Sequence, residues 1–351
     1  MSGAPTIRDI AKHAGVSFKS VSRVINNERS VSPKMRRLVH AAIEKLGYFP
    51  NKNARSLRQS SGGSTGLIAH LYGDAGGHYS TDIQVGLLER CRYFGYHLLV
   101  EELDYKSPNF ERYAKAVIGQ HMPEGVVLAA PLTDNQVLLR ALDEAGIPYV
   151  KITPLVERPN EPSVRIDERA AAYQVAQHLL LFGHRRFGLI RGPDNHAATH
   201  LRQEGFCAAL SEFGVELQPN LIENGEFRFM PTLQAAQRLL SQPDRPTAIF
   251  ATSDEMAAAV LKVAHDLKIR IPEELSIVGF DDSYIAQMLN PPLTTVRQPT
   301  KRLAAAAADL LFTRLSPLGS GQWSSPAPHV ILEYDFVLRT STSFRLEASA
   351  A

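Results

Sequence analysis

The first fifty residues contain three short stretches in which apolar side chains recur at the spacing of a helix. In the first stretch the apolar positions fall at i, i+3, i+4 and i+7: Ile7, Ile10, Ala11 and Ala14. This spacing predicts an amphipathic helix with one apolar stripe. Thr6 can cap its start, with Asp9 completing a capping-box pattern, and Gly15 ends it.

A second helix is predicted to begin just after Ser17, which can cap it. Its buried face consists of Val21, Val24 and Ile25, and Asn26-Asn27 ends it. That face leaves four side chains pointing elsewhere: Phe18, Lys19, Ser22 and Arg23. Two short helices joined by a glycine turn, the second with a polar start, describe a helix-turn-helix.

A third helix is predicted to begin at Ser32-Pro33, because proline at the first helical position sacrifices no hydrogen bond. Its core stripe consists of Met35, Val39, Ala42 and Leu46, and Gly47 ends it. Beyond it, Pro50 prevents the helix from continuing and Asn51 can cap a short new helix whose one large apolar residue is Leu57. Residues 60–64 then read as a flexible linker.

From Thr65 onward the pattern changes to short apolar strands that alternate with amphipathic helices. The predicted strands are Leu67–Tyr72, His97–Leu103, Val126–Ala130, Tyr149–Ile152, Phe187–Arg191, Ala248–Ala251, Ser276–Phe280 and Val330–Val337. Predicted helices include Ala170–Phe182, Arg202–Phe213 and Glu255–Leu267. This alternation predicts parallel sheets covered on both faces, and the number of strands favours two lobes. Ligands of such folds bind at the carboxyl ends of the strands.

Composition places the chain among folded proteins of a reducing compartment. Of the 351 residues, 44% are hydrophobic and 21% are charged, which argues against wholesale disorder. The two cysteines, Cys91 and Cys207, exclude a disulfide scaffold. Because the sequence shows neither a secretory signal nor an apolar run long enough for a bilayer, we expect a soluble cytoplasmic protein without membrane contact.

The net charge of +2 conceals a strongly basic head on an acidic body. Residues 1–60 contain twelve Lys or Arg and three acidic residues, which is typical of nucleic-acid binding. In the second helix Arg23 can offer two N–H donors to a guanine, and Lys19 can do so less rigidly. Phe18 can pack on a thymine methyl or a deoxyribose. The alternative is a three-helix bundle with a solvated basic face, which we consider weaker because capping, turn and charge agree.

Residues Thr6–Leu57, TIRDIAKHAGVSFKSVSRVINNERSVSPKMRRLVHAAIEKLGYFPNKNARSL, closely resemble the DNA-binding head of the LacI/GalR family of bacterial transcription regulators. The resemblance implies that a hinge helix follows the head, and that two such helices of a dimer enter the minor groove. Leu57 stands where the family has a leucine that wedges into the central base step; its alternative is packing against the head. The candidate DNA contacts are Thr6, Ser17, Phe18, Lys19, Ser22, Arg23, Asn26, Arg55 and Leu57.

The body resembles the same family through four segments: FGHRRFGLIRGP, TAIFATSDEMAAAVL, LSIVGFDD and PPLTTVRQP. The resemblance runs to about Ser341 and implies a two-lobed, periplasmic-binding-protein-like core with a pocket for a sugar or purine between the lobes. An aromatic face for a sugar ring and Arg, Asp and Gln partners for its hydroxyls suit that role. The pocket positions that it implies are Tyr79, Ser80, Thr153, Arg202, Phe227, Ser253, Asp254, Asp281 and Gln298.

Several of these residues have other readings. Asp254 can equally cap the helix near Glu255, Asp281-Asp282 can be a metal pair, and Phe227 can belong to the core. The chain also departs from its sugar-binding relatives at two positions. Where this chain has Thr153 they often have an acidic residue, and where it has Ser253 they often have Asn. A glycine-rich loop over residues 73–78 is a further departure, so the sequence leaves the effector open.

Enzymatic readings are weaker. Gly62-Gly63-Ser64-Thr65-Gly66 matches a nucleophile elbow as text, but a polar linker precedes it and a strand follows it. The sequence has no Walker A loop, no H-E-x-x-H and no C-x-x-C, and His184 reads as a structural hydrogen-bonding residue. We therefore predict no enzyme, no cofactor and no metal. A sugar-modifying enzyme and a periplasmic sugar carrier are the alternatives.

We predict a small all-α helix-turn-helix head on a two-lobed α/β body. The domains are residues 1–48 (DNA-binding head), 49–64 (hinge and linker), 65–341 (effector binding and dimerisation) and 342–351 (tail). The predicted function is a homodimeric repressor of carbohydrate-use genes, with operator DNA and a sugar effector as its partners. Residues 343–351 are too few for the heptad helix that family tetramers use, which favours a dimer.

Overall fold

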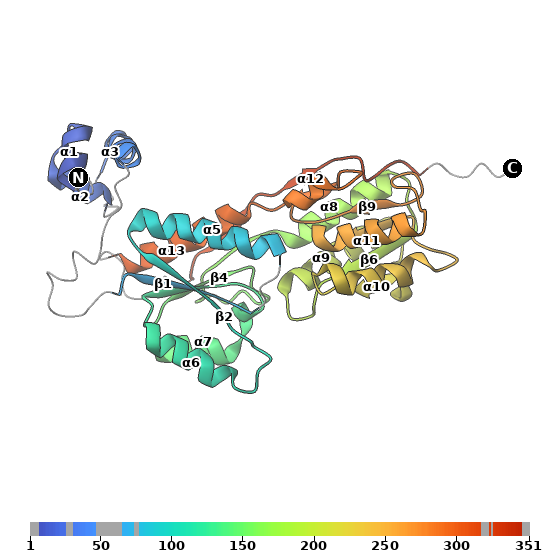
Figure 1. Cartoon of the computed structure of the whole chain (residues 1–351), viewed down its shortest axis with the longest axis horizontal. Coiled ribbons are helices and arrows are strands. Elements are labelled where there is room, and N and C mark those ends of the chain that lie inside the picture. Colours follow the sequence, from blue (N-terminus) through green and yellow to red (C-terminus); the bar gives the residue numbers. More distant parts are fainter. Residues whose placement is uncertain are drawn as a thin grey trace.

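The computed structural model describes residues 7–25, 31–46, 65–73, 77–316, 323 and 326–345, and Figure 1 shows a small helical head beside an elongated body of two lobes. Several predicted positions lie outside the described residues: Thr6, Asn26, Gly47, Arg55, Leu57, the hinge segment and the end of the tail. The Ile25 side chain also lies outside them. None of the described helices is both long and apolar enough to cross a bilayer.

The head consists of three helices around one small core: α1 (Ile7–Ala14), α2 (Phe18–Ile25) and α3 (Pro33–Leu46). Ile10, Val21 and Val39 are completely buried at its centre. The Ser17 hydroxyl accepts a hydrogen bond from the Ser20 N–H at 3.0 Å, and Ser32 accepts one from Met35 at 3.3 Å. Both helices therefore begin at the cap that the sequence predicts.

The N-terminal lobe is a six-stranded, fully parallel sheet in the order β11-β5-β4-β3-β1-β2. Helices α5 and α13 cover one face, and α6 and α7 cover the other (Figure 1). Its elements are β1 (Leu67–Tyr72), α5 (Gly77–Phe94), β2 (His97–Glu102), α6 (Phe110–His121), β3 (Gly125–Leu128), α7 (Gln136–Glu144), β4 (Tyr149–Ile152), β5 (Ser163–Ile166), α13 (Thr300–Leu315) and β11 (His329–Leu332).

The C-terminal lobe is built on a four-stranded parallel sheet in the order β7-β6-β8-β9. Helices α8 and α9 pack together on one face, and α10 and α11 on the other. Its elements are α8 (Glu168–Leu181), β6 (Phe187–Arg191), α9 (Ala197–Glu212), β7 (Ile222–Asn224), α10 (Phe229–Leu240), β8 (Ala248–Ala251), α11 (Asp254–Asp266), β9 (Ser276–Val278) and α12 (Tyr284–Met288). Short 3-10 helices cover Leu132–Asp134 and Pro219–Leu221.

The chain crosses between the lobes three times. It crosses at Asp167, between β5 and α8, and returns near Gln298, between β10 (Thr295–Arg297) and α13. It crosses again at residues 333–334, between β11 and β12 (Asp335–Val337). These crossovers lie beside one another, because β11 pairs with β5 and β12 pairs with β10.

Two helix pairs approach so closely that a side chain would not fit between them. A Cβ at Gly205 of α9 would stand 2.0 Å from the Arg169 carbonyl oxygen of α8. A Cβ at Gly86 of α5 would stand 2.6 Å from the Lys301 carbonyl oxygen of α13. Glycine at these two positions therefore sets the spacing of the helices that cover both sheets.

The predicted fold class, a helical head on a parallel α/β body, is confirmed. Four predicted strands have their predicted bounds, and these are β1, β4, β6 and β8. The predicted strand Val330–Val337 is instead two strands, β11 and β12, because the chain changes lobe at Glu333 and Tyr334. Strands β5, β7 and β10 were not predicted from the sequence, since each has only three or four residues and includes polar ones.

Candidate functional site

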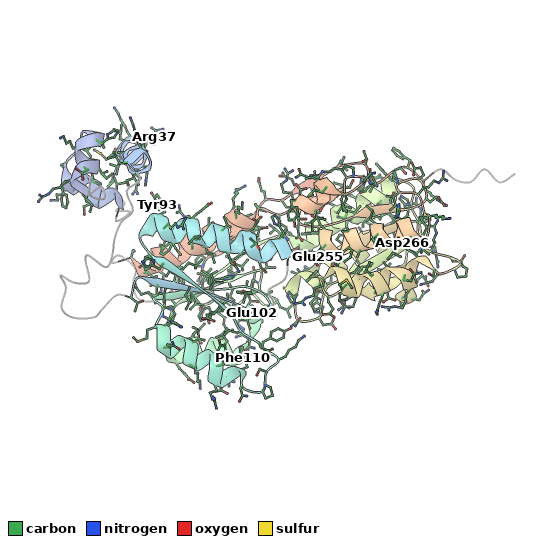
Figure 2. All side chains as sticks on the ribbon, in the orientation of Figure 1. Arg37, Tyr93, Glu102, Phe110, Glu255 and Asp266 are labelled. Carbon is green, nitrogen blue, oxygen red and sulfur yellow. The ribbon has the colours of Figure 1, made fainter. Side chains whose placement is uncertain are left out.

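The head presents the start of α2 to solvent. Phe18, a large apolar residue, is 54% exposed there, and Lys19 beside it is also exposed. Ser22 and Arg23 are partly exposed one turn further on, while Ser17 caps the helix. An exposed aromatic and basic first turn is the part of a helix-turn-helix that can enter a major groove. Figure 2 shows Arg37 on the same head, adding basic charge from α3.

The body contains a cavity of about 130 Å³ between its two lobes. The N-terminal lobe contributes β1, the start of α5 and the loop after β3, whereas the C-terminal lobe contributes α9, the loop after β7 and the start of α11. Figure 2 shows Glu255 at the end of α11 that faces the other lobe. The cavity is lined by His70, Gly77, His78, Tyr79, Ser80, Ile83, Ala129, Ala130, Thr153, Glu168, His196, Ala198, Arg202, Glu226, Phe227, Arg228, Ser253, Glu255, Asp281, Ser283, Ile285 and Gln298.

The Arg202 guanidinium is a buried charged group of the cavity. Its Nε donates to Glu168 Oε2 at 2.7 Å and its Nη2 donates to Glu168 Oε1 at 3.3 Å. Nη1 donates to the Thr252 carbonyl oxygen, and the guanidinium carbon lies 3.5 Å from the centre of the Phe280 ring. Three of its five N–H donors are thus held by protein, which fixes the plane of the guanidinium and leaves two donors.

Asp281 and Gln298 form a second polar pair beside a crossover. Gln298 Nε2 donates to Asp281 Oδ1 at 2.6 Å. Asp281 has a φ of 113°, a backbone conformation that few residues other than glycine adopt. Burial raises the pKa of Asp281, and the nearby Arg202 opposes that rise. A strained backbone and a partly buried acid at one position are typical of a binding site.

Two aromatic residues flank these groups. Tyr79 lies at the start of α5, and burial raises the pKa of its phenol so that the hydroxyl keeps its proton. Phe227 has a φ of 54° and contacts His196 edge-on, with 5.5 Å between the ring centroids. Phe227 also packs against the core of the C-terminal lobe, so the two readings of this residue from sequence are compatible.

Eight of the nine predicted pocket residues line this one cavity, although they come from seven separate segments of the chain. Asp254 does not line it. Its carboxylate accepts from the Ser283 N–H at 2.7 Å and from the Thr295 hydroxyl at 2.6 Å, while burial raises its pKa. The residue that caps α11 is Ser253, which accepts from the Met256 N–H at 3.3 Å. Asp254 is therefore the first helical residue rather than its cap.

The two acids of the metal-pair alternative both have protein partners. Asp282 bonds to Arg297 at 2.6 Å and to Arg339, so it joins two cations. Within residues 7–345, as far as the structure describes them, no cluster of three metal-ligating side chains occurs. His184 accepts or donates to the hydroxyls of Thr247 and Ser276 at 3.0 Å each, which is a structural role.

Sequence reasoning missed three buried polar residues of the cavity, His70, Glu168 and Ser283. His70 stands in the apolar strand LIAHLY, and a single polar residue within such a strand was the available signal. Glu168 follows β5, a strand too short to be predicted, and its partner Arg202 is 34 residues away in the sequence. Nothing local in the sequence indicates that this pair exists.

Comparison with known proteins supports this picture. A model of the LacI family of bacterial regulatory proteins matches residues 6–51, and a model of the periplasmic binding protein-like domain matches residues 176–342. The transcriptional regulator DegA of Bacillus subtilis (strain 168) is 34% identical over 86% of this chain and 88% of its own.

Solved structures agree over nearly the whole chain. A complex of the transcriptional regulator CelR with cellobiose has a TM-score of 0.73 at 30% identity, covering 96% of this chain and 99% of that one. A lac repressor dimer bound to operator and the anti-inducer ONPF has a TM-score of 0.71 at 25% identity, covering 97% and 100%.

A helix-turn-helix head on a two-lobed binding body defines a bacterial transcription regulator. The chain belongs to the LacI family. Its relatives are transcription regulators and not enzymes, as the sequence predicted.

Proposed function

We propose that this protein is a homodimeric repressor of carbohydrate-utilisation genes that binds a palindromic operator and is controlled by a sugar in the cavity between its lobes. The observation that carries the proposal is the placement of Arg202, Glu168, Asp281 and Gln298 in one buried group between the lobes. CelR, a relative whose structure contains cellobiose, and the lac repressor, whose structure contains operator DNA, support it by analogy.

On the DNA side, Phe18, Lys19 and Arg23 read base edges of each half-site, with Ser17 and Ser22 beside them. Thr6, Asn26 and Arg55 add contacts to the sugar-phosphate backbone of the DNA. Leu57 of each protomer wedges into the central step of the operator and bends it. Because most basic residues of the head contact phosphates in this arrangement, binding falls steeply as the salt concentration rises.

On the effector side, the two polar pairs of the cavity adjoin the crossovers. Glu168 follows the crossover at Asp167, and Gln298 lies at the return to α13. A ligand that draws Arg202 or Asp281 toward itself therefore acts on the segments that set the relative orientation of the lobes. Control requires only that the ligand binds one orientation of the lobes more tightly than the other. A ligand that prefers the orientation unable to bind operator induces, and a ligand that prefers the operator-binding orientation co-represses.

A binding experiment tests the proposal. The protein selects a DNA site from a random pool, and fluorescence anisotropy then follows binding while sugars are titrated in. We expect a palindrome whose affinity changes with one sugar, whereas Phe18→Ala combined with Lys19→Ala abolishes the selection in a protein that stays folded and dimeric. A wild-type protein that is folded and dimeric but selects no sequence would overturn the proposal and favour an enzyme that acts on sugars.

A further inference from the structure

The cavity is lined by more acid than base. Four carboxylates line it, those of Glu168, Glu226, Glu255 and Asp281, and two guanidinium groups, those of Arg202 and Arg228. The charge of Arg202 is already balanced by the Glu168 carboxylate, which accepts two hydrogen bonds from it. An anionic ligand would therefore bring a like charge into a buried, acidic space, which is electrostatically unfavourable.

His70 offers a lone pair in the first lobe. Its Nδ1 lies 3.1 Å from the Val127 carbonyl oxygen, which can only accept, so Nδ1 carries the hydrogen. Burial lowers the pKa of His70 to about 4, so the ring is neutral and Nε2 is an acceptor. This side chain is completely buried, lines the cavity, and has no partner for Nε2 among the described residues.

Gln298 offers a second acceptor at the crossover. Its Nε2 donates to the Asp281 carboxylate, which cannot donate in return, so the amide orientation is fixed and Oε1 is the remaining atom. Oε1 is buried and has no partner within the part of the chain that the structure describes. Buried acceptors of this kind are normally paired in folded proteins, which indicates that something with donors completes them.

We propose that the effector is an uncharged, polyhydroxylated compound whose hydroxyl groups donate to His70 Nε2 and Gln298 Oε1, and that phosphorylated or carboxylated sugars are excluded. This inference rests on the proposed function. Hydroxyl hydrogens satisfy both acceptors, and the two remaining N–H groups of Arg202 donate to further hydroxyl oxygens. The oxygens of a phosphate are mostly deprotonated at neutral pH, so they rarely have a hydrogen for either acceptor. One bound molecule would link β1 of the first lobe to the crossover at Gln298.

Isothermal titration of the full-length protein tests the charge preference with matched pairs. The probes are glucose and glucose 6-phosphate, galactose and galactose 1-phosphate, ribose and ribose 5-phosphate, and cellobiose as an unphosphorylated disaccharide. We expect at least one uncharged probe to bind, and its phosphate to bind at least roughly tenfold more weakly. A phosphate that binds more tightly than its parent sugar, or a panel in which no uncharged probe binds, overturns the inference.

Two variants test the acceptors with the uncharged probe that binds. His70→Phe keeps an aromatic ring against Tyr72, which His70 stacks on with ring centroids 5.3 Å apart, but removes Nε2. We expect it to weaken sugar binding roughly tenfold, and His70→Gln, which returns an acceptor near the same place, to recover part of the loss. Gln298→Leu is expected to weaken binding similarly if His70→Phe does not fold. Wild-type affinity in both His70→Phe and Gln298→Leu overturns the assignment.

Operator binding measured in parallel separates the two proposals. If the wild-type protein selects an operator but binds no uncharged sugar, the effector class is wrong and the regulator remains. If it binds sugars with the expected preference but selects no operator, the cavity assignment stands alone. A third check uses deoxy analogues of the bound sugar: the analogue that lacks the hydroxyl facing His70 should bind wild type and His70→Phe equally. Unequal binding of every deoxy analogue contradicts a direct contact.

Discussion

Arg202 and Glu168 form a doubly hydrogen-bonded ion pair in the interior of the body, with side chains that are 5% and 1% exposed. The pair joins α9 to the start of α8 and also faces the cavity. Arg202 therefore has two roles, since it holds the packing of these helices and presents two donors to a ligand. Any test of its binding role must separate these contributions.

We predict that Arg202→Ala lowers the free energy of unfolding by about 3–5 kcal/mol, because it leaves Glu168 buried without a partner. The double variant Arg202→Met with Glu168→Leu removes both charges and should recover most of that loss. Chemical denaturation measures the stability, and sugar titration on a bound operator measures the response. We expect the double variant to bind operator but not to respond to the effector. A full response in that variant would show that Arg202 has only a structural role.

For the head, we predict that Arg23→Ala costs roughly 1–3 kcal/mol of affinity for the selected operator while binding to unrelated DNA changes little. The reason is that a guanidinium on α2 discriminates a base only where its two donors meet a guanine. Lys34→Ala is the matched control, because Lys34 is an exposed cation on α3. Equal losses on all sequences in Arg23→Ala would make Arg23 a phosphate contact.

For the body, we predict that Gly205→Ala destabilises the protein by about 1–3 kcal/mol or more, since its Cβ would meet the Arg169 carbonyl oxygen. Gly119→Ala is the control: it lies within α6, its Cβ would have nothing within 4 Å, and it should stabilise by about 0.5–1 kcal/mol. Thermal unfolding of both variants checks the pair of predictions. Similar effects of the two substitutions would refute close packing of α8 on α9.

A pH prediction follows from His184. Burial lowers its pKa to about 4, from 6.5 in the unfolded chain. The unfolded state thus binds the extra proton between these values, so the stability that His184 contributes is present above pH 6.5 and is lost on acidification toward pH 4. The full difference is about 3 kcal/mol. His184→Gln should show a shallower loss of unfolding free energy over pH 6.5–4.

His70 and His178 also have pKa values lowered to about 4 by burial, and they remain in both proteins. The difference between wild type and His184→Gln therefore isolates one proton. Denaturant titrations at pH 4.5, 5.5, 6.5 and 7.5 measure it. Parallel curves for the two proteins would mean that His184 has the same pKa in the folded and unfolded states.

The sequence predicted those features that depend only on residues close together along the chain. Ser17 and Ser32 mark helix starts by their position alone, and an apolar run such as that of β8 reveals a strand. Strand β5 has no such run, and it forms because β4 and β11 pair with it on both sides. Pairings between distant segments decide such elements, and no local pattern contains them.

The same distinction applies to the cavity. Eight residues carried over from the family resemblance line it, whereas Glu168 and His70 emerged only from the folded chain. Glu168 became visible through its contact with Arg202, and His70 through an acceptor that the described residues leave unpaired. Whether a side chain lacks a hydrogen-bond partner depends on its neighbours in the folded chain, so it cannot be predicted from the position of that residue in the sequence.

The three adjacent crossovers limit how the two lobes can move relative to each other. Rotation about the line that joins them asks for small dihedral changes at Asp167, near Gln298 and at residues 333–334, whereas sliding or separating the lobes would stretch at least one of them. Hinge rotation is therefore the lobe motion that these crossovers oppose least. A ligand that binds between the lobes therefore acts by changing the angle between them. Substitutions that alter the stiffness of the crossovers can change this response while leaving both binding surfaces unchanged.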